Sequence, residues 1–153
     1  MDSNIYVITR IGSKQSLAAD EVFELFGCSR VDNVSDMSEE DIAIEKETFV
    51  QTMKEVVGDA FVGDADKFSF AKDVAKKYAE RIMPIAKKAM QDMTLDDFAD
   101  SYADRNLLSM VLPYNYFYIV TPGRCDSTLD VFLRSDTAVD GEFYVETIFD
   151  YHR

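Results

Sequence analysis

The sequence predicts an α+β fold: a small antiparallel sheet, made of an N-terminal strand and a C-terminal three-stranded meander, packed on one face against about four helices. Residues 4–10 (NIYVITR) have the β-branched and aromatic content of a strand. Apolar residues recur every three or four positions through the middle of the chain, which indicates amphipathic helices. The last 40 or so residues return to strand-like runs separated by turns. A length of 153 residues fits a single domain, residues 1–153.

The first helix is predicted from a cap at Ser13 or Ser16 to about Phe26, with Gly27 placed to end it. Residues 28–37 have the composition of a loop. Ser38 starts the second helix, because three acids follow it and acids suit the positive end of a helix. This helix is expected to run to about residue 60.

A long amphipathic helix is predicted from about residue 67 to 93, after the break at 58–66. Pro84 lies inside it, so we expect a kink or a break into two helices near Met83. The capping-box match at residues 94–97 (TLDD) starts a further helix to about residue 110, where Pro113 stops any continuation. The expected buried face of that helix consists of Leu95, Phe98, Ala99 and Tyr102.

The three C-terminal strands are predicted at residues 114–121, 128–135 and 142–151. Their connections are rich in turn residues, and this spacing is typical of an antiparallel meander. The N-terminal strand is expected to join the same sheet, since an isolated strand would leave its backbone groups unpaired.

The charge of the chain is its most unusual property. Twenty-nine Asp and Glu against 16 Lys and Arg give a net charge of −13. Such a chain repels nucleic acid and anionic membranes, so neither is expected as a direct partner. A basic protein is the partner that this charge attracts. With no signal-peptide pattern and two cysteines far apart, the sequence predicts a cytoplasmic protein with reduced thiols.

No motif indicates catalysis, a metal or a cofactor, so the sequence predicts a protein that is not an enzyme. The single histidine, His152, is next to the last residue, and Cys125 has no candidate base near it in the sequence. One histidine and two distant cysteines do not form a zinc pattern. The acidic stretches that begin at Asp32 and Asp64 lack the Gly and Glu of a calcium-binding EF-hand loop. There is no P-loop or dinucleotide-binding glycine pattern.

Basic residues cluster in one segment. Residues 66–92 hold seven Lys and Arg and four acids, so this segment carries +3 and the rest of the chain −16. The pattern favours a solvated helix face. The alternative is a basic helix that docks against acidic neighbours.

Two rows of carboxylates are the candidate binding surface. On the helix that starts at Thr94, three acids at spacings of three and four line the side opposite the apolar face over about 10 Å; they are Asp97, Asp100 and Asp104. The helix that starts at Ser38 offers a second row, which consists of Glu39, Glu40, Asp41, Glu45 and Glu47. Tyr102 is an aromatic candidate for an interface anchor. Whether these rows are used, or are only the solvated side of a helix, the sequence leaves open.

The predicted function is that of an acidic protein-interaction module that binds a basic surface of a partner protein. It would act as an inhibitor, a nucleic-acid mimic or an immunity-type factor against a nucleic-acid-handling enzyme or toxin. One alternative is a non-catalytic subunit of a larger assembly, whose acids only keep it soluble. Another is a small enzyme or ligand-binding domain with a site near the 122–134 turn, where the residues to inspect are Arg124, Cys125, Asp126 and Arg134. The partner and the oligomeric state stay open.

Overall fold

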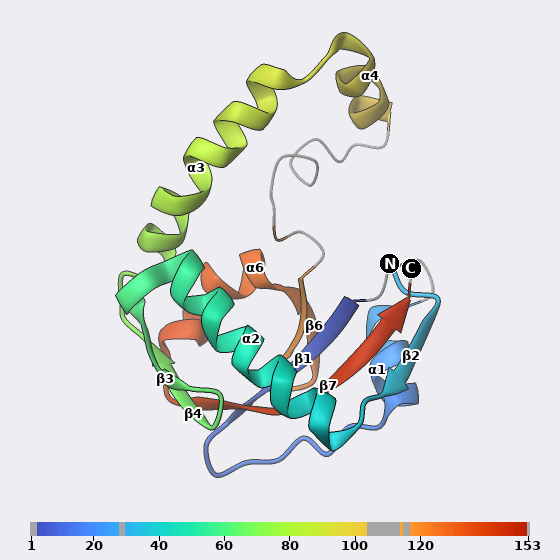
Figure 1. Ribbon diagram of the computed structural model, residues 1–153, viewed down its shortest axis with the longest axis vertical. Helices are drawn as coiled ribbons and strands as arrows, with labels where there is room; N and C mark the ends of the chain where they lie inside the picture. The colour runs from blue at the N-terminus through green and yellow to red at the C-terminus, as the bar shows by residue number, and fades with distance from the viewer. Residues whose placement is uncertain (1–2, 28–29, 104–113, 115–116, 153) are drawn as a thin grey trace.

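A computed structural model describes residues 3–27, 30–103, 114 and 117–152, without the side chains of residues 100–103 (Figure 1). The described part is a mixed α and β structure, as the sequence predicts. Its strands are β1 (Ser3–Arg10), β2 (Asn33–Asp36), β3 (Phe61–Asp64), β4 (Lys67–Phe70), β5 (Tyr118–Thr121), β6 (Cys125–Thr128) and β7 (Phe143–His152). Its helices are α1 (Ala19–Phe26), α2 (Glu39–Val57), α3 (Val74–Asp92), α4 (Leu95–Ala103) and α6 (Leu129–Leu133), with short 3-10 turns η1 (Gly58–Ala60) and η2 (Asp136–Val139).

The sheet is larger than predicted, and it is mixed. It has seven strands in the order β3-β4-β7-β1-β5-β6, with β2 pairing on β7 beside this path. The expected meander is wrong, because β1 lies between β5 and β7, parallel to β5 and antiparallel to β7. Residues 5–9 of β1 are all buried, so both faces of this strand are covered, which is typical of an interior position.

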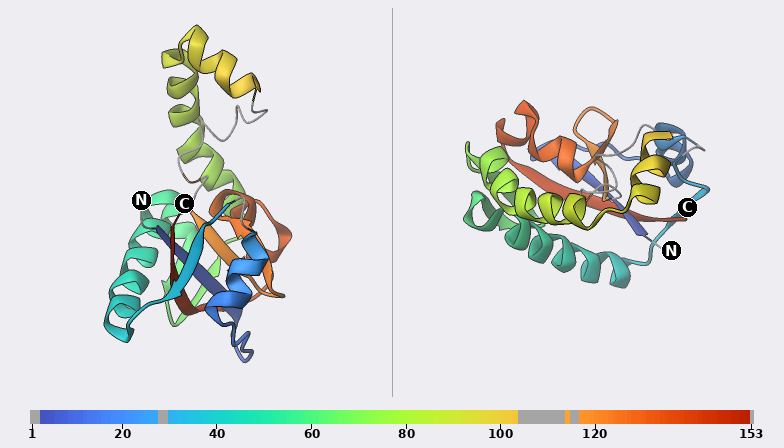
Figure 2. Two further views of the ribbon diagram at one scale, coloured as in Figure 1. Left: turned by 90° about the vertical axis from the view of Figure 1, so that its right-hand side faces the viewer. Right: turned by 90° about the horizontal axis from the view of Figure 1, so that it is seen from above.

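The helices cover both faces of the sheet, not one face as predicted (Figure 2). Ile5 and Val7 of β1 pack with α1, whose Val22 and Phe26 are buried. Alternate residues of the same strand point to the opposite face, where the core contains Tyr6 and Ile8 of β1 and the buried residues of α2, α3 and α6. Two separate cores therefore share one sheet.

A hairpin replaces the predicted start of the long helix. Residues 61–70 form β3 and β4, so α3 begins at Val74 rather than near residue 67. The Asp64 carboxylate accepts hydrogen bonds from the amides of Asp66 and Lys67, and these bonds close the turn between the strands. Phe68 and Phe70 are buried two residues apart, which is a strand period that the neighbouring helical pattern obscured.

Two further segments differ from the prediction. The strand expected at 128–135 is the helix α6, because the Thr128 hydroxyl accepts a hydrogen bond from the amide of Val131 and caps the first turn. Leu129, Phe132 and Leu133 are buried at helical spacing. The predicted loop at 28–37 contains the strand β2, which pairs with the C-terminal half of β7.

The distal half of α3 and the helix α4 project away from the sheet (Figures 1 and 2). The predicted break does not occur, because α3 continues as one helix through Pro84. The apolar face expected to be buried on α4 is exposed, with Leu95 83% and Phe98 47% accessible and Ala99 also exposed. Periodicity predicted which residues share a face, but at the far end of α3 no part of the sheet covers that face. The predicted C-terminal end of this helix, residues 104–110, lies outside the described residues.

Candidate functional site

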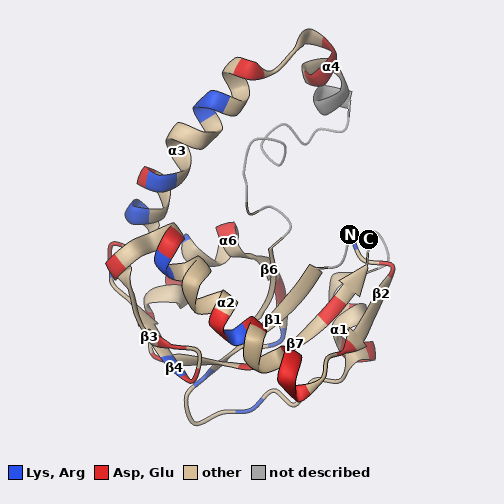
Figure 3. Cartoon of the chain, in the orientation of Figure 1, with Lys and Arg blue, Asp and Glu red and all other residues tan. Residues whose placement is uncertain are grey.

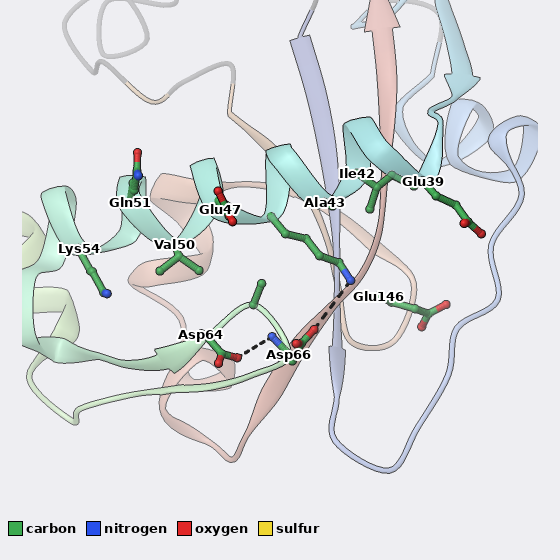
Figure 4. A pocket seen from close by; sticks show the side chains of 12 residues that line it. Glu39, Ile42, Ala43, Glu47, Val50, Gln51, Lys54, Asp64, Asp66 and Glu146 are labelled. Atoms are coloured by element: carbon green, nitrogen blue, oxygen red, sulfur yellow. Dashed lines mark hydrogen bonds and ion pairs between the residues drawn. The ribbon is translucent and has the colours of Figure 1, made fainter.

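A groove with a volume of about 830 Å³ runs beside α2 (Figure 4). One face of α2 from Glu39 to Lys54 forms its long wall. The turn between β3 and β4 (residues 64–66) and Glu146 of β7 form the other side. The backbone of the turn is fixed next to β7, since the Val145 amide donates a hydrogen bond of 2.8 Å to the Ala65 carbonyl.

The groove has apolar side chains along its length and charged side chains among them. The apolar residues are Ile42, Ala43, Val50 and Ala65. The charged residues are Glu39, Lys46, Glu47, Lys54, Asp64, Asp66 and Glu146, so five acids face two lysines and the lining carries −3. One of these lysines, Lys46, is partly neutralised by an ion pair of 3.9 Å between its Nζ and Asp66 Oδ1. A cationic ligand with some apolar surface is the chemistry that this lining favours.

The sequence of α2 explains why acids face the groove. The Ser38 hydroxyl accepts a hydrogen bond of 3.1 Å from the Asp41 amide, which confirms the predicted start of the helix. Phe49, Met53 and Val56 recur at spacings of four and three and are buried against the sheet. The groove-lining positions lie on another side of the same helix, where the sequence places acids and lysines.

Glu146 occupies an irregular position in β7. The pairing with β1 shifts between Val7, which opposes Thr147, and Ile8, which opposes Val145. Glu146 is therefore the extra residue of a β-bulge, a device that redirects a side chain. Its carboxylate accepts three hydrogen bonds: 2.9 Å from the Thr9 hydroxyl, 2.7 Å from the Gln15 amide and 2.9 Å from the Ser16 amide.

These donors set the charge state of Glu146. Burial by itself would raise the pKa of its carboxyl group. The hydrogen bonds from Gln15, Ser16 and Thr9, together with the nearby charge of Lys14, outweigh burial and lower the pKa below its ordinary value. Glu146 is thus a fixed negative charge at the end of the groove, and it also ties the loop after β1 to β7.

The predicted carboxylates of α2 divide into three groups. Glu39 and Glu47 line the groove. Glu40 and Asp41 are exposed and are not part of its lining. Glu45 accepts a hydrogen bond of 3.2 Å from the Tyr6 hydroxyl, so it faces the sheet. Burial, with a contribution from Glu45, raises the pKa of Tyr6 to about 12.

The second predicted row does not join the first. α4 lies at the far end of α3, whereas α2 lies against the sheet, so the two helices form no common surface (Figure 3). Asp97 acts as a cap: its carboxylate accepts from the Thr94 amide at 3.1 Å, and the Asp97 amide donates to the Thr94 hydroxyl at 3.1 Å. The predicted capping box is therefore confirmed, and the hydrogen bond from the Thr94 amide is the main cause that lowers the pKa of Asp97. The side chains of Asp100 and Tyr102, and all of Asp104, lie outside the described residues.

The residues near the 122–134 turn do not converge on one site. Arg124 donates to the Gln15 carbonyl at 2.8 Å and pairs with Glu21 at 3.2 Å. Arg134 pairs with Asp130 at 2.6 Å on α6. Asp126 pairs with Arg30, and Cys125 is exposed. Each of these charged side chains pairs with a different neighbour, so the contacts stabilise separate parts of the fold and do not form a common site.

In the described part of the chain, no three His, Cys, Asp or Glu side chains gather closely enough to hold a metal ion. None of the described helices combines the length and apolarity needed to cross a lipid bilayer. No family model, curated protein or solved structure matches this chain. The charge and shape of the groove are therefore the observations on which a functional interpretation depends.

Sequence reasoning missed half of the groove. It singled out Glu39 and Glu47, but not Asp64, Asp66 or Glu146. The Asp-Ala-Asp sequence at 64–66 is a turn signal between two phenylalanine-containing runs, and it could have revealed the hairpin. Nothing local marks Glu146, because the bulge that redirects it depends on the pairing of β7 with β1.

Proposed function

We propose that this protein is an acidic protein-interaction module that binds a basic, partly apolar segment of a partner protein in the groove beside α2. The observation that carries the proposal is the groove lining, where a net charge of −3 surrounds a row of apolar side chains. A lysine- or arginine-rich segment would place its charges near Glu39 and Glu47 and its apolar residues on Ile42 and Val50.

The charge of the whole chain supports this proposal. The chain has 29 acids and 16 Lys and Arg. Even if every cation paired with one acid, the chain would keep 13 negative charges in excess. Such a surplus attracts basic partners and accelerates their association, with an effect that salt weakens.

The proposed partner class is a nucleic-acid-handling enzyme or a toxin with a basic binding surface. Glu39 and Glu47 are eight residues apart on α2, which places them about 12 Å apart along the helix axis. The basic surface of such a partner already binds anionic groups, because contacts of its Lys and Arg with phosphates supply most of its affinity for nucleic acid. The two carboxylates of Glu39 and Glu47 would take the place of phosphates on that surface. In this role the protein is an inhibitor or immunity-type factor that competes with nucleic acid.

The test measures binding of a synthetic helical peptide of about four turns, built from Lys and Leu, by titration calorimetry as salt rises from about 0.05 to about 0.5 M. The perturbed protein carries Glu39→Lys and Glu47→Lys. Reversing two rim charges removes two attractions and adds two repulsions, so we expect binding at least about tenfold weaker at low salt. A parallel assay asks whether the wild-type protein suppresses RNA cleavage by a basic ribonuclease and whether the variant does so less.

The matched control carries Glu24→Lys and Asp32→Lys, which change the net charge by the same amount at exposed positions outside the groove. We expect the control to bind the peptide within about twofold of the wild type. If both double variants lose affinity equally, only the overall charge matters and the groove is not the site. Binding that does not weaken with salt would also reject the proposal.

A further inference from the structure

The middle of the groove holds a cation that belongs to the protein itself. Lys46 of α2 lies about halfway along the wall that runs from Glu39 to Lys54. Its Nζ is 3.9 Å from Asp66 Oδ1 on the opposite side, so this ion pair joins α2 to the 64–66 turn across the groove (Figure 4). The groove is therefore already spanned by a positively charged side chain.

Lys46 lies where a lysine of another protein could lie. Ile42 and Val50 are at i−4 and i+4 from it, so they flank its stem on the same helix face. The Lys46 side chain is only 29% exposed, although its charge is paired at the rim. A lysine commonly lays its stem along apolar side chains while its charged end stays at the surface. The groove offers a lysine or arginine from outside the same apolar contacts and the same acid.

The contact between Lys46 and Asp66 is of the kind that exchanges. A distance of 3.9 Å is too long for a hydrogen bond, so the two charges attract each other without a directional contact. The Asp66 side chain is 88% exposed, which leaves it accessible to a second cation. An ion pair at such an exposed position changes an equilibrium constant by at most a factor of about five. A cation of similar strength therefore replaces Lys46 with little loss.

We propose that Lys46 is an internal competitor for the groove, and that a lysine or arginine of the partner displaces it from Asp66 on binding. The displaced ammonium group turns into solvent, because its flexible four-carbon stem allows other rotamers. In this role Lys46 lowers the affinity of the groove for cationic segments, and Asp66 is the acid that holds the partner's cation. The inference rests on the proposed function, since it concerns the regulation of the same groove.

The test measures binding of the synthetic Lys and Leu peptide to the full chain by titration calorimetry at about 0.05 M salt. Lys46→Gln removes the competing cation and leaves Asp66 to the peptide, so we expect binding about fivefold tighter than to the wild type. Lys54→Gln is the matched control, because it removes the same charge from the same lining at an exposed position about 12 Å away along α2. The control should tighten binding by no more than about twofold.

A substitution of Asp66 shows whether the peptide takes the place of Lys46. In the wild type, Asp66→Asn removes the acid from the competitor and from the peptide alike, so the affinity should change by less than about twofold. In the Lys46→Gln background only the peptide loses a partner. Adding Asp66→Asn there should weaken binding about fivefold, back to the wild-type level.

The same measurements separate this inference from the proposed function. The inference falls if Lys46→Gln binds the peptide no more tightly than Lys54→Gln does, or if Asp66→Asn has the same effect with and without Lys46. The proposed function still stands in that case, provided that reversing Glu39 and Glu47 weakens peptide binding more than its own control does. If that reversal leaves peptide binding unchanged, both fall.

Discussion

Replacing Glu146 by Gln should destabilise the protein by about 2 kcal/mol at neutral pH. The carboxylate accepts from the Thr9 hydroxyl, the Gln15 amide and the Ser16 amide at 2.7 to 2.9 Å. The side-chain amide of the Glu146→Gln variant has one oxygen, so in its better orientation it keeps the bonds from Gln15 and Thr9 and turns its NH₂ toward the Ser16 amide. One charge-assisted hydrogen bond is lost and two become neutral, which weakens them by roughly half.

The magnitude follows from that count. A hydrogen bond to a charged group contributes about 1.5–3 kcal/mol, so one lost bond and two halved bonds sum to about 3–6 kcal/mol at a fully buried site. Glu146 is only partly buried, so water replaces part of the loss and lowers it to about 2 kcal/mol. For a chain of this length, about 2 kcal/mol corresponds to a melting temperature lower by roughly 4–8 °C. Thermal unfolding followed by circular dichroism measures it. Glu142→Gln is the control, because Glu142 makes an exposed ion pair of 3.4 Å with Lys67 that is worth at most about 1 kcal/mol.

The pH dependence gives a second measurement on the same pair of proteins. The pKa of Glu146 is lower in the folded protein than its ordinary value of 4.5. Its contribution to the free energy of unfolding is therefore present above pH 4.5 and is lost as the pH falls through the folded pKa. The difference between the wild type and Glu146→Gln should shrink below pH 4.5. A difference that is absent at neutral pH, or that grows as the pH falls, would refute this account of Glu146.

Three other substitutions test the fold. Gly63→Ala should lower the free energy of unfolding by about 3 kcal/mol or more, because φ is +111° and the new Cβ would clash with the Lys67 carbonyl oxygen. Chemical denaturation measures this loss. Gly27→Ala is the control and should lose less, because no atom lies within 4 Å of its Cβ. Met53→Ala should cost about 2–5 kcal/mol in the same assay, since Met53 is completely buried. Thr94→Ala removes the cap of α4 and should speed hydrogen exchange of its first amides about fivefold, while the global melting temperature stays unchanged.

Local chemistry was sufficient to predict the points where several helices begin or end. The predicted cap of α1 at Ser13 or Ser16 is wrong, because the N-cap of α1 is Ala18. Ser38 and Thr94, in contrast, cap α2 and α4 as predicted, and Gly27 follows the last residue of α1 with a positive φ of 74°. These features depend on hydrogen bonds and backbone angles within a few residues, so the sequence contains all the information they need. The mixed α and β class and the net charge of −13 were equally readable.

Burial was harder to predict than periodicity. The spacing of Leu95, Phe98 and Ala99 indicated a common helix face, but the position of α4 beyond the far end of α3, away from the sheet, leaves that face exposed. Likewise, the apolar residues of α6 fit both a strand and a short helix, and the Thr128 cap with the packing of Phe132 decided the outcome. A pattern shows which side chains are neighbours along one element, and only contacts with other elements show what covers them.

By itself the sequence determined the charge of this protein and the caps of α2 and α4, and it singled out Glu39 and Glu47 together with three other acids of α2. The tertiary structure alone decided that β1 lies between β5 and β7, and that Glu146 is the extra residue of a bulge beside α2 and the 64–66 turn. Strand pairing joins residues more than a hundred positions apart, and its free energy depends on side chains from both partners at once. No local pattern encodes such a pairing, so the groove that it assembles could be seen only in the folded chain.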